Sequence, residues 1–148
     1  MKRLIVLVCL FLFSISFAQK SGSKDVPKVV KDKFSATFKE VNNVKWSKEK
    51  TEFEASFKMG KKNKSVTLDE FGKIIDIETE IKVSDLPKDI LVSVKKDFAG
   101  YKITEAAKIE TEGAITYEAE VTKGKEKMDL IYDGNGNLKN KTKFPDKN

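Results

Sequence analysis

The sequence has no histidine and very little cysteine, arginine or proline. Its 148 residues include one cysteine, Cys9, and three prolines, and its one arginine is Arg3. Zinc and copper sites need imidazole or thiolate ligands, and the common nucleophilic sites pair serine or cysteine with histidine. We therefore expect no metal, no other cofactor and no catalytic residue, and we interpret the protein as a non-enzyme.

The longest apolar run lies near the amino terminus, over residues 4–13. Two basic residues precede it and the small residues Ser16 and Ala18 follow, which is the order of a secretory signal peptide. The run is shorter than the roughly 20 residues that span a bilayer, and Cys9 lacks the small preceding residues of a lipoprotein signal. We predict a signal peptide over 1–18 and a periplasmic or secreted protein with no membrane span after cleavage.

Cleavage after Ala18 would leave residues 19–148, which contain no cysteine, histidine or arginine. Without disulfides in an oxidising compartment, this chain must be stabilised by a packed core, and its length is enough for one. Two of the 29 basic residues would be lost, leaving 27 lysines against 23 acidic residues and a net charge of +4. Because this small charge is spread along the chain, we expect no nucleic-acid partner.

The chain repeats itself at an offset of about 60 residues. Residues 25–38 and 85–98 share an aspartate, a proline, a lysine and a phenylalanine at matching positions. Residues 53–74 and 117–138 share six more identities, after a four-residue insertion in the second half. We interpret the pattern as a tandem duplication. The two predicted repeats are residues 19–82 and 83–148.

Each repeat is predicted to begin with a helix. Apolar residues recur at positions i, i+4 and i+8 in both repeats, which places them on one helical face. The two stripes are Val30, Phe34 and Phe38, and Ile90, Val94 and Phe98. Pro27 and Pro87 stand at the first turn, where a missing N–H costs little.

Strands are predicted to follow each helix. In "TEFEASFK" (51–58) and "AITYEAEVT" (114–122), apolar and polar residues alternate, as in strands with one buried face. The other predicted strands lie at 65–69, 73–81, 128–133 and 137–144, with weaker ones at 43–47 and 101–110. The sequence thus predicts an α+β fold of two tandem repeats, each one helix packed on an antiparallel sheet of about four strands. The helix would cover the apolar face, leaving the polar face open to solvent or to a partner.

These segments together resemble the PepSY-like domains of secreted bacterial proteins, a group related to β-lactamase-inhibitor proteins (BLIP). The motifs are V/L-P-x-x-[IV] at 26–30 and 86–90, Val-Lys-Trp at 44–46, Tyr-Lys-Ile at 101–103, F/Y-E-A at 53–55 and 117–119, and D-x-x-G at 69–72 and 133–136. The resemblance covers nearly all of the chain after residue 18. It implies helix-on-sheet repeats, export, and binding or inhibition of another protein such as a peptidase, with no catalytic residue.

The segment "LIYDGNGNL" (130–138) has the alternating oxygen-bearing residues of a calcium loop. An EF-hand starting at Asp133 would need glycine at the sixth position and a bidentate acid at the twelfth. Those positions hold Leu138 and Phe144. The corresponding segment of the first repeat keeps only the aspartate and the glycine equivalent to Gly136, which are hairpin-turn residues. We therefore predict a turn and no metal site.

The polar face of the predicted strands carries the candidate partner-binding residues. Ile131 lies between the inward-facing Leu130 and Tyr132, so we expect it on that face as one exposed isoleucine. The acids there are expected to be solvated, with no neighbouring group to shift their pKa values, which argues against catalysis. The candidate residues are Glu54, Ser56, Glu118, Glu120 and Ile131.

The densest basic segment, "KMGKKNK" (58–64), suggests an alternative function. A lysine-rich hairpin could bind lipid or polysaccharide, although such a tip more often only keeps a hairpin soluble. The residues of this alternative patch are Lys58, Lys61, Lys62 and Lys64. Trp46, the one tryptophan, is expected to pack between helix and sheet. The oligomeric state, and whether the two sheets join, are left open by the sequence.

Overall fold

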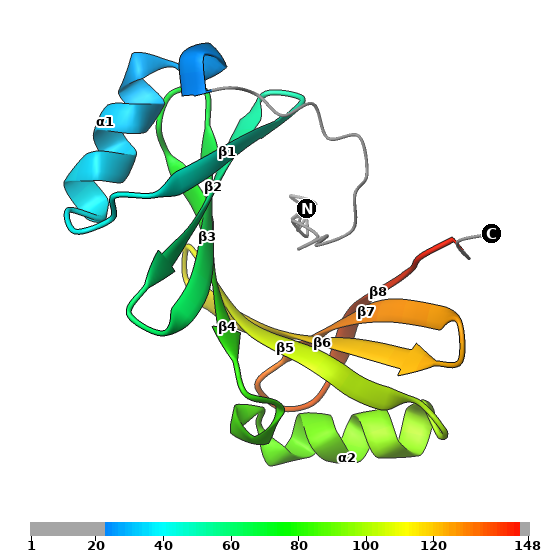
Figure 1. Ribbon diagram of the computed structural model, residues 1–148. Coiled ribbons are helices and arrows are strands. Elements are labelled where there is room, and N and C mark those ends of the chain that lie inside the picture. Colours follow the sequence, from blue (N-terminus) through cyan, green and yellow to red (C-terminus); the bar gives the residue numbers. More distant parts are fainter. Residues whose placement is uncertain (1–22, 146–148) are drawn as a thin grey trace, which may run out of the picture.

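The computed structural model of the protein describes residues 23–145 (Figure 1). The predicted signal peptide at 1–18 lies outside the described residues. The first half contains η1 (Ser23–Asp25), α1 (Lys28–Thr37), β1 (Val44–Glu49), β2 (Glu52–Met59), β3 (Lys62–Asp69) and β4 (Ile74–Ile81). The second half contains η2 (Val83–Asp85), α2 (Lys88–Asp97), β5 (Lys102–Thr111), β6 (Ala114–Lys123), β7 (Glu126–Asp133) and β8 (Leu138–Lys143).

All eight described strands form one antiparallel sheet in the order β1 to β8. The sequence left open whether the strands of the two halves join. They do join, because β4 pairs with β5. This pairing runs from Asp76 opposite Thr111 to Ile81 opposite Ala106. The predicted α+β class and antiparallel pairing are confirmed. The repeat boundary at residue 82 stays a prediction.

The two helices pack their predicted stripes against the sheet. Val30 and Phe34 of α1, and Ile90 and Val94 of α2, are buried. Phe38 and Phe98 directly follow the helices and are partly buried against the same cores. Both prolines directly precede their helices at the N-cap position rather than inside the first turn, because their ψ angles near 140° are extended rather than helical.

Two hydrophobic cores lie between the helices and the sheet. The first comprises Val26, Val30, Phe34, Phe53, Ala55, Phe57, Val66 and Leu68. The second comprises Leu86, Ile90, Val94, Ala106, Ala119, Val121, Met128, Leu130 and Tyr132. Trp46 is partly buried beside the first, with its ring centroid 5.3 Å from that of Phe34, which confirms its predicted place between helix and sheet. Ile115, in the alternating segment 114–122, is 48% exposed although it is apolar, because it lies near the turn of the β5–β6 hairpin.

The sheet bends along its length, and both helices lie on the outside of the bend (Figure 1). The residues of β2, β3, β6 and β7 that belong to the two hydrophobic cores face these helices. The alternate residues of the same strands point the other way, to the inside of the bend. We call this second, helix-free surface the inner face.

Candidate binding face

The inner face carries an unusual number of acidic side chains for a basic protein. Strand pairing places them on one surface: Glu54 is opposite Thr67, Thr67 opposite Asp76, and Glu120 opposite Asp129. Its six central carboxyl groups are Glu54, Asp76, Glu78, Glu118, Glu120 and Asp129. Hydroxyl groups and three apolar side chains lie between them, namely Ser56, Ser65, Thr67, Thr116, Ala107, Ile109 and Ile131.

The predicted candidates all lie on this face, but not in the predicted surroundings. Ile131 pairs with Glu118 across β6 and β7, so the alternation argument placed it correctly. It is only 2% exposed, however, and Glu118 and Glu120 are each 7% exposed. Glu54 and Ser56 are half-buried. The expectation of a solvated face is therefore wrong, because strands flank these residues on both sides and the inward bend brings neighbouring side chains together.

The expectation that no group would shift the pKa values of these acids is also wrong. Burial, and next the nearby carboxylates of Asp129 and Glu120, raises the pKa of Glu118 to about 8. Burial, and next Glu120, raises the pKa of Asp129 to about 7. A carboxylate leaves water at a cost, and like charges add to that cost, so both effects favour the protonated form.

The first half of the sheet continues the same electrostatic pattern. Burial raises the pKa of Asp76 to about 6, although a hydrogen bond from Thr67 opposes the shift. Burial, and next the charge of Glu118, raises the pKa of Glu78 well above its usual range. Burial raises the pKa of Glu54 less, because its carboxylate accepts hydrogen bonds from Ser56 at 3.2 Å and from Ser47 at 3.4 Å.

Glu118 and Glu120 differ in their partners although they are neighbours on β6. Glu120 forms an ion pair with Lys127 and accepts a hydrogen bond from Thr104 Oγ1 at 2.8 Å. Glu118 Oε2 is buried and has no hydrogen-bond partner in the part of the chain that the structure describes. The Oγ1 atom of Thr116, two residues earlier on the same face, is in the same situation. Two of the three buried inner-face atoms without a hydrogen-bond partner among the described residues therefore lie on β6, and the third, Ser65 Oγ, lies on β3.

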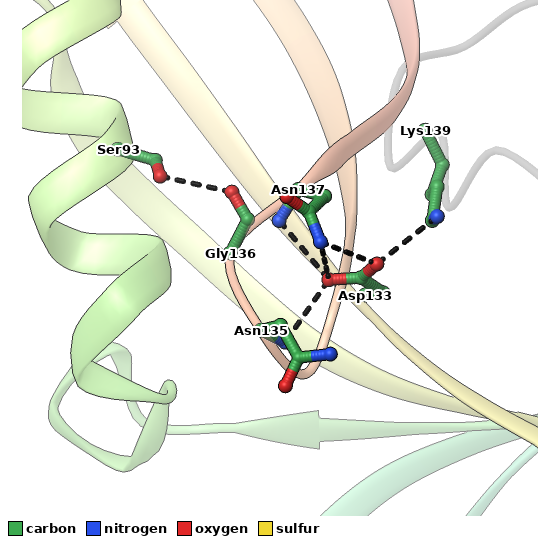
Figure 2. A network of polar contacts seen from close by, with 6 residues as sticks. All are labelled: Ser93, Asp133, Asn135, Gly136, Asn137 and Lys139. Carbon is green, nitrogen blue, oxygen red and sulfur yellow. Dashed lines mark hydrogen bonds and ion pairs between the residues drawn. The ribbon is translucent and has the colours of Figure 1, made fainter.

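The predicted turn after β7 is confirmed (Figure 2). One carboxylate oxygen of Asp133 accepts the backbone N–H groups of Asn135 and Asn137, each at 3.0 Å. The Asn137 side chain and an ion pair with Lys139 at 3.0 Å occupy the carboxylate further. Gly136 has a φ of +79°. The hydrogen bonds from Asn137 hold the pKa of Asp133 well below its usual range. Both oxygens of this carboxylate therefore accept hydrogen bonds within the turn.

The β3–β4 turn is built in the same way. Asp69 accepts the backbone N–H groups of Phe71 at 2.9 Å and Lys73 at 2.8 Å, and Gly72 has a φ of +83°. Over residues 23–145 the structure contains no group of three or more acidic, cysteine or histidine side chains placed to hold a metal ion.

The alternative lysine patch is not one surface. Lys58, Lys61 and Lys62 are exposed around the β2–β3 turn, where Gly60 has a φ of +63°. Lys64 is half-buried and donates a hydrogen bond to Thr79 at 2.9 Å. It pairs with the core residue Phe57 and so lies on the helix-covered side of the sheet, whereas Lys58 alternates with Ser56 toward the inner face.

Sequence reasoning missed three inner-face acids. Asp76 and Glu78 were part of a predicted strand, "KIIDIETEI", in which their equal parity places them on one face. Asp129 lies between Met128 and Leu130, both predicted to face inward, so it had to face away from the core. The same parity argument that found Ile131 could have found all three.

Comparisons with known proteins were made for sequence and for fold. The family model described as "Putative beta-lactamase-inhibitor-like, PepSY-like" matches the chain twice, over residues 18–76 and 77–140. The comparison with curated proteins gave no match. Neither helix within the described residues is long and apolar enough to cross a membrane.

Several solved structures share the fold at low sequence identity. A Bacteroides eggerthii protein described as a "putative periplasmic" protein has a TM-score of 0.73 and 14% identity, over 80% of this chain and 88% of its own. A DUF2874 family protein of Bacteroides ovatus has a TM-score of 0.70 and 19% identity, over 79% and 86%. A BLIP-like protein of Bacteroides fragilis has a TM-score of 0.65 and 18% identity, over 79% and 85%. Because both family matches together cover most of the sequence, the chain belongs to the PepSY-like, β-lactamase-inhibitor-like family.

Proposed function

We propose that the protein is an exported, non-enzymatic binding module whose inner face binds another protein. It would act as an inhibitor or regulator of an envelope or secreted protein such as a peptidase. The family description and the BLIP-like structural neighbour support an inhibitor-type role. The two family matches, over residues 18–76 and 77–140, support a tandem duplication, for which we keep the proposed repeats 19–82 and 83–148.

The main observation behind this proposed function is the group of buried, incompletely paired carboxyl groups on the inner face. Asp76, Glu78 and Asp129 are nearly as buried as core residues. Moving a charged group out of water without a partner is unfavourable in free energy. Strongly perturbed carboxyl groups gathered on one surface are typical of a functional site rather than of a structural core. This distinguishes the inner face from the helix-covered face, where the buried side chains form two hydrophobic cores.

Export gives the first testable prediction. Protein recovered from the periplasmic fraction or the medium is expected to have the mass of residues 19–148, because the apolar run ahead of Ala18 has the features of a cleaved signal. Intact-protein mass spectrometry measures this directly. Replacing Val8 with arginine should interrupt the run and leave the full-length chain inside the cell. Exported protein that retains Met1 would contradict the prediction.

Partner capture gives the second prediction. Purified protein is expected to retain a specific protein from the same cellular fraction, identified by mass spectrometry. Ser56→Arg and Thr122→Arg, one in each half of the inner face, should each reduce this capture at least about tenfold, because each inserts a bulky cation into the contact surface. Ser56 and Thr122 are half-buried strand residues outside the two hydrophobic cores.

The matched control neutralises the exposed lysines of the alternative patch. Lys61→Gln with Lys62→Gln should leave capture unchanged, and all variants should have wild-type melting temperatures within a few degrees. If capture or lipid binding instead depends on these lysines and ignores Ser56→Arg and Thr122→Arg, the inner-face proposal is wrong and the hairpin is the binding site.

A further inference from the structure

Glu118 is a buried carboxyl group with one oxygen that has no hydrogen-bond partner among the described residues. It is 7% exposed, and its Oε2 atom and Thr116 Oγ1 are both buried without a hydrogen-bond partner among the described residues. Leaving a buried acceptor without a hydrogen bond destabilises the protein, and the cost is larger for a charged group. A donor arriving from outside the chain would remove that cost.

The charge around Glu118 selects a cation. Seven charged groups affect the pKa of Glu118 or that of Glu78, besides the effect of Glu118 on Glu78. They are Asp129 and Lys127 on β7, Glu120 on β6, Glu105 on β5, and Glu78, Asp76 and Glu54 on β4 and β2. Lys127 is the one ammonium in this set, and it is already paired with Glu120. An additional positive charge would therefore meet uncompensated carboxyl groups.

The apolar neighbours of Glu118 favour a cation that has an apolar part. Glu118 is flanked by Ala107 on β5 and Ile131 on β7, and Ile109 lies opposite Thr116. All three apolar side chains are buried. Lysine and arginine have an aliphatic stem and a charged end, so they suit a surface with an apolar floor and a carboxyl group. A bare metal ion suits it poorly, since no metal-binding set of side chains exists within residues 23–145.

Resting on the proposed function, we propose that the inner face binds a basic segment of the partner protein, with a lysine or arginine side chain placed between Glu118 and Asp129. Arginine fits the site best because its planar group donates several parallel hydrogen bonds. The incoming cation favours the ionised carboxyl groups, so binding is accompanied by proton release. Binding therefore strengthens from pH 5.5 to pH 8.

The test uses a fluorescein-labelled peptide, GVRVRVG, and its counterpart in which citrulline replaces arginine. Fluorescence anisotropy at pH 8 and low salt should detect binding of the arginine peptide and none of the neutral peptide. Glu118→Gln with Asp129→Asn should weaken binding at least about tenfold, because truncating a desolvated charge pair has effects of that size. Binding should also weaken at pH 5.5 and in 0.5 M NaCl.

The matched control removes the same two charges elsewhere. Glu70 and Asp32 are exposed, and Glu70→Gln with Asp32→Asn should change peptide binding less than about twofold, as expected for surface charges. Equal binding by wild type and the Glu118→Gln, Asp129→Asn variant, or equal binding of the citrulline peptide, would overturn the inference.

Two further outcomes separate this inference from the proposed function. If Ser56→Arg abolishes capture of the partner but the arginine peptide does not bind, the proposed function holds and the cationic segment is wrong. Sedimentation velocity of the protein alone tests a second copy as the occupant. Self-association that is lost on Glu118→Gln with Asp129→Asn would assign the face to a second copy and overturn the partner assignment.

Discussion

The folded protein is expected to be more stable at pH 5 than at pH 8. The pKa of Glu118 is about 8 and that of Asp129 about 7 in the folded state, above their ordinary values of 4.5 and 3.8. At pH values between the ordinary and the folded pKa values, the folded state therefore binds more protons than the unfolded state. This stabilisation is fully present below the unfolded pKa values and is lost as the pH rises through the folded ones.

The size of the effect follows from linkage. Each extra proton changes the free energy of unfolding by about 1.4 kcal/mol per pH unit. These two carboxyl groups should then give up to about 6 kcal/mol between pH 8 and pH 5, which corresponds to a rise in melting temperature of up to roughly 20 °C for a domain of this size. Circular-dichroism melts at constant ionic strength measure this rise.

The variants and the pH range make the experiment specific. Glu118→Gln with Asp129→Asn should raise stability at pH 8 and reduce the pH dependence, with the remaining slope due to Asp76 and Glu78. Glu70→Gln with Asp32→Asn should keep the wild-type slope. The pKa of Asp133 is lowered in the folded state, so its contribution is lost only as the pH falls toward and below 3.8. Measurements above pH 5 avoid that effect. A stability that is flat or increases from pH 5 to pH 8 would contradict the prediction.

Gly136→Ala is expected to destabilise the protein by roughly 2–4 kcal/mol. Gly136 has a φ of +79°, which costs a residue with a side chain about 1 kcal/mol or more. An added Cβ would also lie 2.8 Å from the backbone carbonyl carbon and oxygen of Asp89 in α2. Overpacking of this kind typically costs a further 1–3 kcal/mol. Urea unfolding monitored by tryptophan fluorescence and circular dichroism measures the change.

Gly134 provides the control within the same turn. Its φ is not positive, and open space surrounds the position that an added Cβ would take. Gly134→Ala should therefore change stability by less than about 0.5 kcal/mol. Gly72→Ala in the first half should fall between them, since its nearest contact is the Val29 carbonyl oxygen at 3.0 Å. Equal stability of the two alanine variants in the β7–β8 turn would show that α2 does not rest on Gly136.

The β7–β8 turn illustrates how far local sequence reasoning reached. The aspartate and glycine retained in both halves predicted a hairpin turn, and the hydrogen bonds of Asp133 confirm it. The contact between this turn and α2, where Ser93 donates to the Gly136 carbonyl oxygen at 2.9 Å (Figure 2), was not predicted. It joins residues 43 positions apart, and no short-range pattern carries that information.

At the candidate binding face too, local sequence predicted some properties and not others. Alternation assigned Glu54, Glu118, Glu120 and Ile131 to the side of the sheet away from the helices, because successive side chains on a strand point to opposite faces. Alternation has no bearing on how closely side chains from different strands approach one another. Alternation therefore did not predict the burial of Glu118, its raised pKa or the effect of the Asp129 charge on that pKa.

Local periodicity and turn chemistry in the sequence thus determined the helices, the strands, the tight turns and the assignment of residues to faces. These properties depend on neighbours within a few positions. The joining of β4 to β5, the bend of the eight-stranded sheet and the gathering of six carboxyl groups on its inner side appeared only in the folded chain. They depend on strands that are distant in sequence, and the burial and charge that make the inner face a candidate binding site exist only when those strands are assembled.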